Sequence, residues 1–201
     1  IDKIDFAGFG ALITTGTVLA AQPSRDATMK AFKLAKAAGL PIIFDIDYRP
    51  YSWASGAEAA SVYSAAAKYC DIIIGNDDEF GVMAGSKQDG LPLAQKLAQE
   101  SAQIVIYKKG EFGSTTFHDG GSFQTGIFPV EALKPTGAGD SFLGAFIASL
   151  AAGLSVEDSV ARGSAAAAIV VSRVGCAPAM PTLPELENFI NTHDGLSPVD
   201  A

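Results

Sequence analysis

Short apolar runs alternate with helical segments through the first half of this 201-residue chain, and no other feature restricts its fold as much. The runs "PIIFDID", "CDIIIGN" and "QIVIYKK" are continuous and rich in Ile, as buried strands are. Segments with helical spacing separate them, at 22–38, 57–69, 77–83 and 91–100. The alternation predicts an α/β fold with a mostly parallel sheet.

The two ends of the chain differ from this middle part. The opening "IDKIDFAGFGALITTG" reads as a strand over 4–14 that begins almost at once, and this abrupt start suggests that a piece precedes the chain. The segment "GSTTFHDGGSFQTG" alternates around Asp119-Gly120-Gly121, which predicts a hairpin at a sheet edge. Further helices are expected at 141–152, 156–171 and 184–191. We expect one domain over 1–193 and a frayed tail over 194–201.

The composition of the chain argues against several classes of binding partner. The net charge is −8 and no cluster of basic residues is longer than Lys108-Lys109, which argues against a surface for nucleic acid or an anionic membrane. No apolar run approaches the roughly 18 residues of a membrane span. Cys70 and Cys176 lack metal-binding spacing, so we expect reduced thiols in a cytoplasmic protein. An anionic ligand must then be bound by a local anion-binding site and not by the overall charge of the protein.

The segment "KPTGAGDSFLGAFIASLAAG" contains a candidate for such a site. Gly137, Ala138 and Gly139 stand at the start of an apolar helix, where backbone N–H groups are unpaired and the helix dipole is positive. Because none of the three has a side chain larger than methyl, their amides can approach a phosphoryl group closely. The segment predicts a phosphate-binding helix start.

Asp140 follows directly and has two interpretations. A carboxylate in the first helical turn is an ordinary partner of the helix dipole. Beside an anion pocket it can also accept the proton of a hydroxyl that attacks a bound phosphorus. The residues alone leave both open. The chain contains no Walker loop, no protein-kinase Gly-rich loop and no dinucleotide fingerprint, which disfavours the common nucleotide-binding folds.

Three motifs in order, "GNDDEF", "KKGEFGS" and "KPTGAGDSF", resemble those of the PfkB/ribokinase family of sugar kinases. They match its N-x-x-E motif, its nucleotide-site turn and its C-terminal signature, and the resemblance covers nearly the whole chain. It implies a ribokinase-like three-layer α/β/α fold. It also implies ATP-dependent phosphorylation, assisted by Mg²⁺, of a primary hydroxyl of a sugar or sugar acid.

The resemblance also assigns roles on the nucleotide side. Asp140 would be the catalytic base, and the 137–139 amides would steady the charge on the transferring group. Asn76 and Glu79 would organise Mg²⁺ and the phosphates through water; from the sequence alone, Asn76 ends a strand and 77–79 cap the next helix. Lys108 and Lys109 would neutralise phosphate charge or form a solvated pair. The other nucleotide-side residues implied are Gly110, Gly113, Thr136, Ala168, Gly175 and Ala177.

Asp45, Asp47 and Arg49 follow another strand end, where ligands of open α/β sheets bind. Arg49 is a candidate for binding the carboxylate of a sugar acid. An Asp47–Arg49 surface pair is the alternative. The stretches "DIDYRPYSW" and "FPVEALKPTGAGDSF" are similar to those of the sugar-acid kinases of inositol catabolism within this family.

The sequence departs from the family pattern in two ways. Many members have Asp, which helps to bind a monovalent cation, where this chain has Lys134, so we predict K⁺-independent activity. Members also carry roughly a further third upstream, with lid strands that grip the sugar and often form a homodimer. We therefore expect the N-terminal part and lid to be missing here. The alternatives are a 2-keto-3-deoxygluconate kinase, a fructokinase, a ribokinase or a non-catalytic nucleotide-binding domain.

Overall fold

The computed structural model describes residues 1–193 and 195–196, so most of the expected 194–201 tail lies outside the described residues. Six strands form one sheet in the order of the chain. The strands are β1 Leu12–Thr15, β2 Ile42–Asp45, β3 Ile72–Asn76, β4 Ile104–Lys108, β5 Ser114–His118 and β6 Gly121–Thr125. The α-helices are α1 Ser24–Ala37, α2 Gly56–Ala67, α3 Asp77–Ala84, α4 Gly90–Glu100, α5 Ala138–Ala151, α6 Val156–Val171 and α7 Leu183–Thr192.

These elements confirm the predicted alternation, with one correction at the start of the chain. The first strand begins at Leu12 and not near Ile4. The carboxylate of Asp5 accepts the N–H of Ala7 at 3.1 Å and caps a 3₁₀ turn at Phe6–Gly8. This local capping bond favours a turn over a strand, because it satisfies an N–H group that a strand would have to pair elsewhere.

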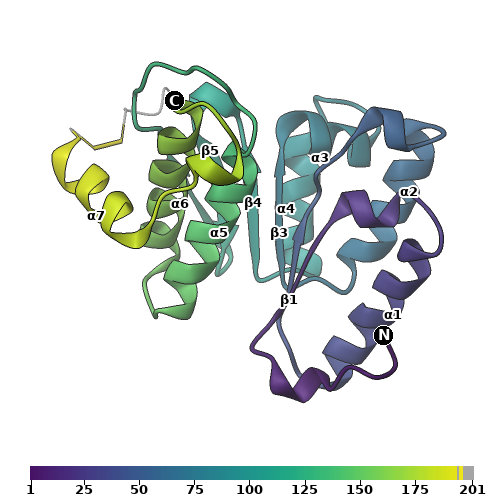
Figure 1. Cartoon of the computed structure of the whole chain (residues 1–201). Coiled ribbons are helices and arrows are strands. Elements are labelled where there is room, and N and C mark those ends of the chain that lie inside the picture. The colour runs from purple at the N-terminus through teal and green to yellow at the C-terminus, as the bar shows by residue number, and fades with distance from the viewer. Residues whose placement is uncertain (194, 197–201) are drawn as a thin grey trace. The chain divides into compact units, whose positions relative to one another are not determined.

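Strands β1 to β4 pair in parallel, each with the next along the chain. Since β–helix–β crossovers are right-handed, a sheet that grows in one direction carries its connecting helices, α1 to α4, on one face (Figure 1). The predicted hairpin is also confirmed: β5 and β6 are neighbours joined by Asp119 and Gly120. Both turn residues have positive φ, 48° and 73°, as a type I′ turn requires.

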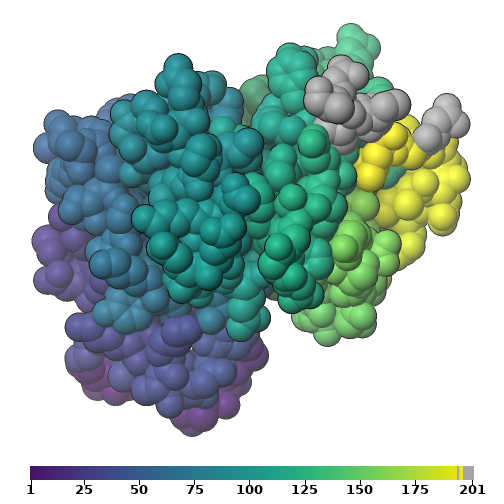
Figure 2. Space-filling model, turned by 180° about the vertical axis from the view of Figure 1, so that it is seen from behind, coloured from purple at the N-terminus to yellow at the C-terminus, as the bar shows by residue number. Residues whose placement is uncertain are grey.

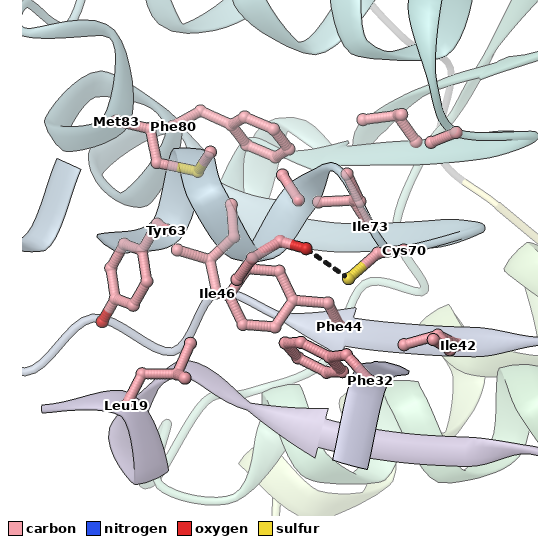
Figure 3. Packing of buried hydrophobic residues seen from close by; sticks show 14 of the residues in the cluster. Leu19, Phe32, Ile42, Phe44, Ile46, Tyr63, Cys70, Ile73, Phe80 and Met83 are labelled. Atoms are coloured by element: carbon pink, nitrogen blue, oxygen red, sulfur yellow. Dashed lines mark hydrogen bonds between the residues drawn. The ribbon is translucent and has the colours of Figure 1, made fainter. Parts of the chain in front are cut away.

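The chain divides into two compact units, Ile1–Lys109 with Thr115–Ser122, and Gly110–Ser114 with Phe123–Ala201. Figure 2 shows most of the first unit in purple to teal and most of the second in green to yellow. The first unit is filled by a large apolar cluster, in which Phe32 of α1, Phe44 of β2 and Tyr63 of α2 are fully buried (Figure 3). Burying aromatic side chains of this size contributes much of a core's stability. The prediction of a single domain over 1–193 stays a prediction.

The second unit is built on the pair α5 and α6, with α7 packed against α6 (Figure 1). Phe128 and Phe189 meet here with ring centroids 5.4 Å apart. The buried members of its apolar cluster are Phe128, Ala165, Ala166, Ala168, Ile169 and Leu186. Among the residues that the structure describes, no helix combines the length and apolar character needed to cross a bilayer.

Asp71 lies just before β3 and connects the amino ends of three strands. Its carboxylate accepts the N–H of Ile42 at 2.8 Å and pairs with Lys36 of α1 at 2.8 Å. Its backbone oxygen accepts the N–H groups of Gln103 and Ile104, which precede and open β4. One residue therefore fixes β2, β3, β4 and the end of α1 at this edge of the sheet.

Candidate active site

The start of α5 is shaped by a glycine that no other residue could replace without strain. Gly137 is the N-cap residue and has φ +89°, in the left-handed region. A Cβ on it would lie 2.7 Å from Sγ of Cys176 and 3.4 Å from Cε of Met180. Gly137 is therefore required both by its backbone conformation and by the 175–180 loop packed against it.

The amides at this helix start are partly open. The carbonyl of Gly137 accepts the N–H of Ser141 at 2.9 Å. The N–H of Ala138 donates to the carbonyl of Pro135 at 3.2 Å, so this amide already has an acceptor within the chain, and its predicted role toward phosphate stays a prediction. Within the described part of the chain, the N–H groups of Gly139 and Asp140 donate to no acceptor. Two adjacent amides at a positive helix end can bind an anion.

The side chain of Asp140 is exposed and does not turn into the interior. It forms no ion pair with any described residue. Thr136, which precedes Gly137, is also exposed. The carboxylate is therefore accessible to an incoming ligand from the same helix turn that carries the open amides.

Other predicted nucleotide-side residues of the second unit lie in three places. Gly175, with φ +126°, and Ala177 flank Cys176, so the structure brings their loop beside Gly137. Gly110 and Gly113 both have positive φ, and a Cβ on Gly113 would collide with the carbonyl of Thr125. Ala168, only 6% exposed, lies within the apolar cluster of this unit.

In the first unit, Asn76 and Glu79 form a complete capping box at the start of α3. The N–H of Glu79 donates to Oδ1 of Asn76 at 2.9 Å, and the N–H of Asn76 donates to Oε2 of Glu79 at 2.7 Å. Glu79 is 6% exposed, and desolvation by burial raises the pKa of its carboxyl group. The hydrogen bond from Asn76, the positive charge of Lys108 and the hydrogen bond from Tyr48 oppose that shift, and the charge of Asp45 adds to it. The capping interpretation thus describes the contacts of Asn76 and Glu79 with each other.

The carboxyl ends of neighbouring strands bring several predicted residues together. Asn76 pairs in register with Lys108 on β4, and Asp45, which is buried, ends β2 on the other side of β3. Lys108 and Lys109 are half-buried. Polar side chains thus line the strand ends at which ligands of parallel sheets bind.

Arg49 and Asp47 are paired with each other. Nη2 of Arg49 lies 2.6 Å from Oδ1 of Asp47, and Nη1 donates to the carbonyl of Tyr48 at 3.3 Å. The surface pair weighed from the sequence is therefore present. The guanidinium remains half-exposed, and its remaining N–H groups are available to a ligand.

Two contacts of the site were not foreseen. One is the approach of Cys176 to Gly137. The other is the N–H of Tyr48, which donates to Oε1 of Glu79 at 3.2 Å. Neither leaves a signal in the local sequence, because both join segments that lie far apart along the chain.

The two thiols, Cys70 and Cys176, should differ in reactivity because they differ in burial. Cys70 is 1% exposed, its Sγ donates to the carbonyl of Ala66 (Figure 3), and burial raises its pKa to about 12. Cys176 is half-buried. At pH ~8 we expect one fast thiol in a titration of the native protein with a chromogenic disulfide and two after denaturation. Two fast thiols in the native protein would contradict this.

The raised pKa of Cys70 determines how the stability of the protein should change with pH. Because the folded-state pKa is raised, the folded state holds the proton more tightly than the unfolded state does. The free energy of unfolding should therefore fall as the pH rises above the ordinary thiol pKa of ~8.5. A Cys70→Ala variant should lack this part of the pH dependence in urea unfolding.

Comparison with solved structures defines the fold class. The chain superimposes on the fructokinase with bound ATP from Xylella fastidiosa with a TM-score of 0.84 at 21% identity, covering 92% of this chain and 62% of that chain. The aminoimidazole riboside kinase from Salmonella enterica gives a TM-score of 0.80 at 22% identity, covering 90% and 62%. An E. coli chain in complex with ATP and Mg²⁺ gives 0.81 at 26% identity, covering 92% and 59%. The fold is the three-layer α/β/α fold of ribokinase-like kinases, with a mostly parallel sheet.

The sequence comparison gives the family. Residues 4–183 match the pfkB family of carbohydrate kinases, and the chain belongs to this family. It is similar to the 5-dehydro-2-deoxygluconokinase of Photobacterium profundum, with 43% identity over 199 residues, covering 96% of this chain and 60% of that protein. The 5-dehydro-2-deoxygluconokinase of Geobacillus kaustophilus is 41% identical over 186 residues, covering 90% and 56%. The chain thus spans between 56% and 60% of the length of these two relatives.

Proposed function

We propose that the protein carrying this chain transfers the γ-phosphoryl group of Mg·ATP to a primary hydroxyl of a sugar acid, 5-dehydro-2-deoxy-D-gluconate. The observation that carries the proposal is the start of α5, where an exposed carboxylate on Asp140 lies beside the open N–H groups of Gly139 and Asp140. A base and an anion site within one helix turn are what phosphoryl transfer to an alcohol requires.

The chemistry follows from these groups. The carboxylate of Asp140 accepts the proton of the attacking hydroxyl, while the open amides stabilise negative charge on the group in transfer. General-base catalysis and electrostatic stabilisation of this kind each contribute about 10²–10⁴-fold to the rate. Gly137 keeps this helix start open, because any side chain there would press on the 175–180 loop.

Residues of this chain also fit a nucleotide and Mg²⁺. In the described ranges 1–193 and 195–196, no group of three or more His, Cys, Asp or Glu side chains could hold a metal ion by itself. Mg²⁺ keeps several waters and binds through one or two carboxylates together with phosphates, so it would be held chiefly by ATP. Asn76 and Glu79 would act on that complex through water. Lys108 would add positive charge at the end of β4.

The sugar-acid substrate is supported by two observations. The relatives named above are 5-dehydro-2-deoxygluconokinases, and Arg49 presents a half-exposed guanidinium at the end of β2. Arg can bind a carboxylate with two parallel hydrogen bonds, while Asp47 can accept from a hydroxyl. A cytoplasmic location and a homodimer formed through upstream segments stay predictions.

A substrate panel tests the proposal. The full-length protein is incubated with Mg·ATP and 5-dehydro-2-deoxygluconate, 2-keto-3-deoxygluconate, fructose or ribose, and ADP release is measured. We expect the highest kcat/KM with 5-dehydro-2-deoxygluconate. A higher value with one of the other sugars would reassign the substrate within the family. ATP binding without phosphorylation of any sugar would instead indicate a non-catalytic nucleotide-binding protein.

The same assay tests the prediction about monovalent cations. Lys134 is exposed, and its backbone N–H donates to the carbonyl of Val171 at the end of α6. An ammonium group at this position repels K⁺ and replaces its charge. We expect kcat to change less than about twofold when KCl is replaced by tetramethylammonium chloride at equal ionic strength. A clear stimulation by K⁺ would contradict the prediction.

A further inference from the structure

The turn formed by residues 46–49, at the carboxyl end of β2, is packed tightly at its first residue. The N–H of Ile46 donates to the carbonyl of Ile74 at 2.9 Å. A Cβ on Gly16 would collide with the carbonyl of Ile46, and a Cβ on Gly75 would lie 2.6 Å from its Cδ1. The backbone and the side chain of Ile46 therefore have no spare room.

The next residue of the 46–49 turn has an unfavourable backbone conformation. Asp47 has φ +40°, and left-handed conformations of non-glycine residues persist only where surrounding contacts hold them. The contact at this point comes from α3. Oε1 of Glu79 accepts the N–H of Tyr48, the amide that directly follows Asp47.

Glu79 thus does more than cap its own helix. Of the two bonds of the capping box, the side chain of Glu79 supplies only one, in which Oε2 accepts the N–H of Asn76 at 2.7 Å. The second oxygen reaches across to the turn after β2, and the carboxylate that makes both bonds is 6% exposed. Removing one partner of a buried hydrogen bond is costly, because the other group is then left without a partner.

We infer that Glu79 is a positioning residue for the acceptor site. Its buried carboxylate holds the 46–49 turn in the conformation that places Asp47 and Arg49 at the strand end, and so connects the N-x-x-E segment to acceptor binding. The effect on acceptor binding rests on the proposed function. The claim that Glu79 stabilises the 46–49 turn rests only on the contacts of Glu79, Tyr48 and Asp47.

The test combines hydrogen exchange with kinetics in the full-length protein. Glu79→Gln leaves one carbonyl oxygen for two N–H donors, so at least one bond is lost. We expect peptides covering 46–49 to exchange about tenfold faster while peptides from β4 are unchanged. The KM for the sugar acid should rise several-fold, in addition to any change in the KM for Mg·ATP that follows from the proposed role of Glu79 toward that complex. Asp78→Asn is the matched control, because Asp78 is exposed on the same helix turn and pairs with Lys87; it should change neither quantity.

A conservative variant keeps the test decisive if Glu79→Gln does not fold. Glu79→Asp retains both carboxyl oxygens but is one methylene shorter, so we expect an intermediate increase in exchange at 46–49. Unchanged exchange at 46–49 in a folded variant would overturn the inference, as would a loss confined to the KM for ATP. If the protein phosphorylated no sugar acid, the proposed function would fail, but the exchange result would still decide whether Glu79 stabilises the turn. Failure of the proposed function and failure of this inference are therefore distinguishable.

Discussion

Replacing Asp140 by Asn is expected to lower kcat for sugar-acid phosphorylation by about 10²–10⁴-fold and to leave the Kd for ATP within about twofold. Asn is close in shape to Asp but cannot accept the proton of the attacking hydroxyl. The side chain of Asp140 is exposed and contacts no described residue by ion pairing, so the change should disturb little else. Steady-state kinetics and calorimetric titration with ATP measure the two quantities.

Asp158→Asn is the matched control for this change. Asp158 is an exposed carboxylate in the first turn of α6, so it has the same relation to its helix dipole as Asp140 has to that of α5. The control should leave kcat unchanged and cost at most about 1 kcal/mol of stability. If Asp140→Asn lowered kcat and ATP affinity equally, or behaved like the control, Asp140 would be a structural residue.

Gly137→Ala should be damaging in two ways. The left-handed conformation of Gly137 costs an L-residue about 1–2 kcal/mol, and the new Cβ would press on Cys176 at 2.7 Å. We expect a loss of about 1–3 kcal/mol in the free energy of unfolding. Because the helix start must shift to relieve the contact, the Kd for ATP should rise at least about tenfold. Urea unfolding and ATP titration measure the two effects.

Gly144→Ala separates this local effect from the general effect of alanine in a helix. Gly144 lies in the same helix, is exposed, and has no heavy atom within 4 Å of an added Cβ. The change should stabilise the protein by about 0.5–1 kcal/mol and leave ATP binding unaltered. In Gly137→Ala/Cys176→Ala the packing part of the loss should be recovered, and the backbone part should remain. Wild-type ATP affinity in Gly137→Ala would contradict the proposed site.

The sequence predicted the parallel strands well because their apolar runs are continuous, and it predicted the hairpin because Asp119 and Gly120 both tolerate positive φ. The first strand was placed too early. Its apolar residues look like a strand, but Asp5 forms a local capping bond that a periodicity argument does not weigh.

The parts of the candidate site also differ in how well the sequence predicts them. The open helix start at α5 could be predicted from three small residues and a carboxylate. The loss of one amide to Pro135 depends on the path of the chain before the helix. The bond between Glu79 and Tyr48 depends on two strands being neighbours, which no local pattern specifies. Site residues are thus predictable as types, and their partners are set by tertiary structure.

The position of Asp71 has a consequence for engineering this protein. Asp71 joins β2, β3, β4 and α1 at the amino ends of the strands, whereas the residues proposed to face ligands follow the opposite ends. Strand register is therefore fixed at the end of the sheet opposite the loops that we propose select the substrate. Exchanging the segment 47–52, which lies between the buried residues Ile46 and Trp53, for that of a relative with another sugar preference should change selectivity while leaving the scaffold intact, because the graft touches neither Asp71 nor these two core residues.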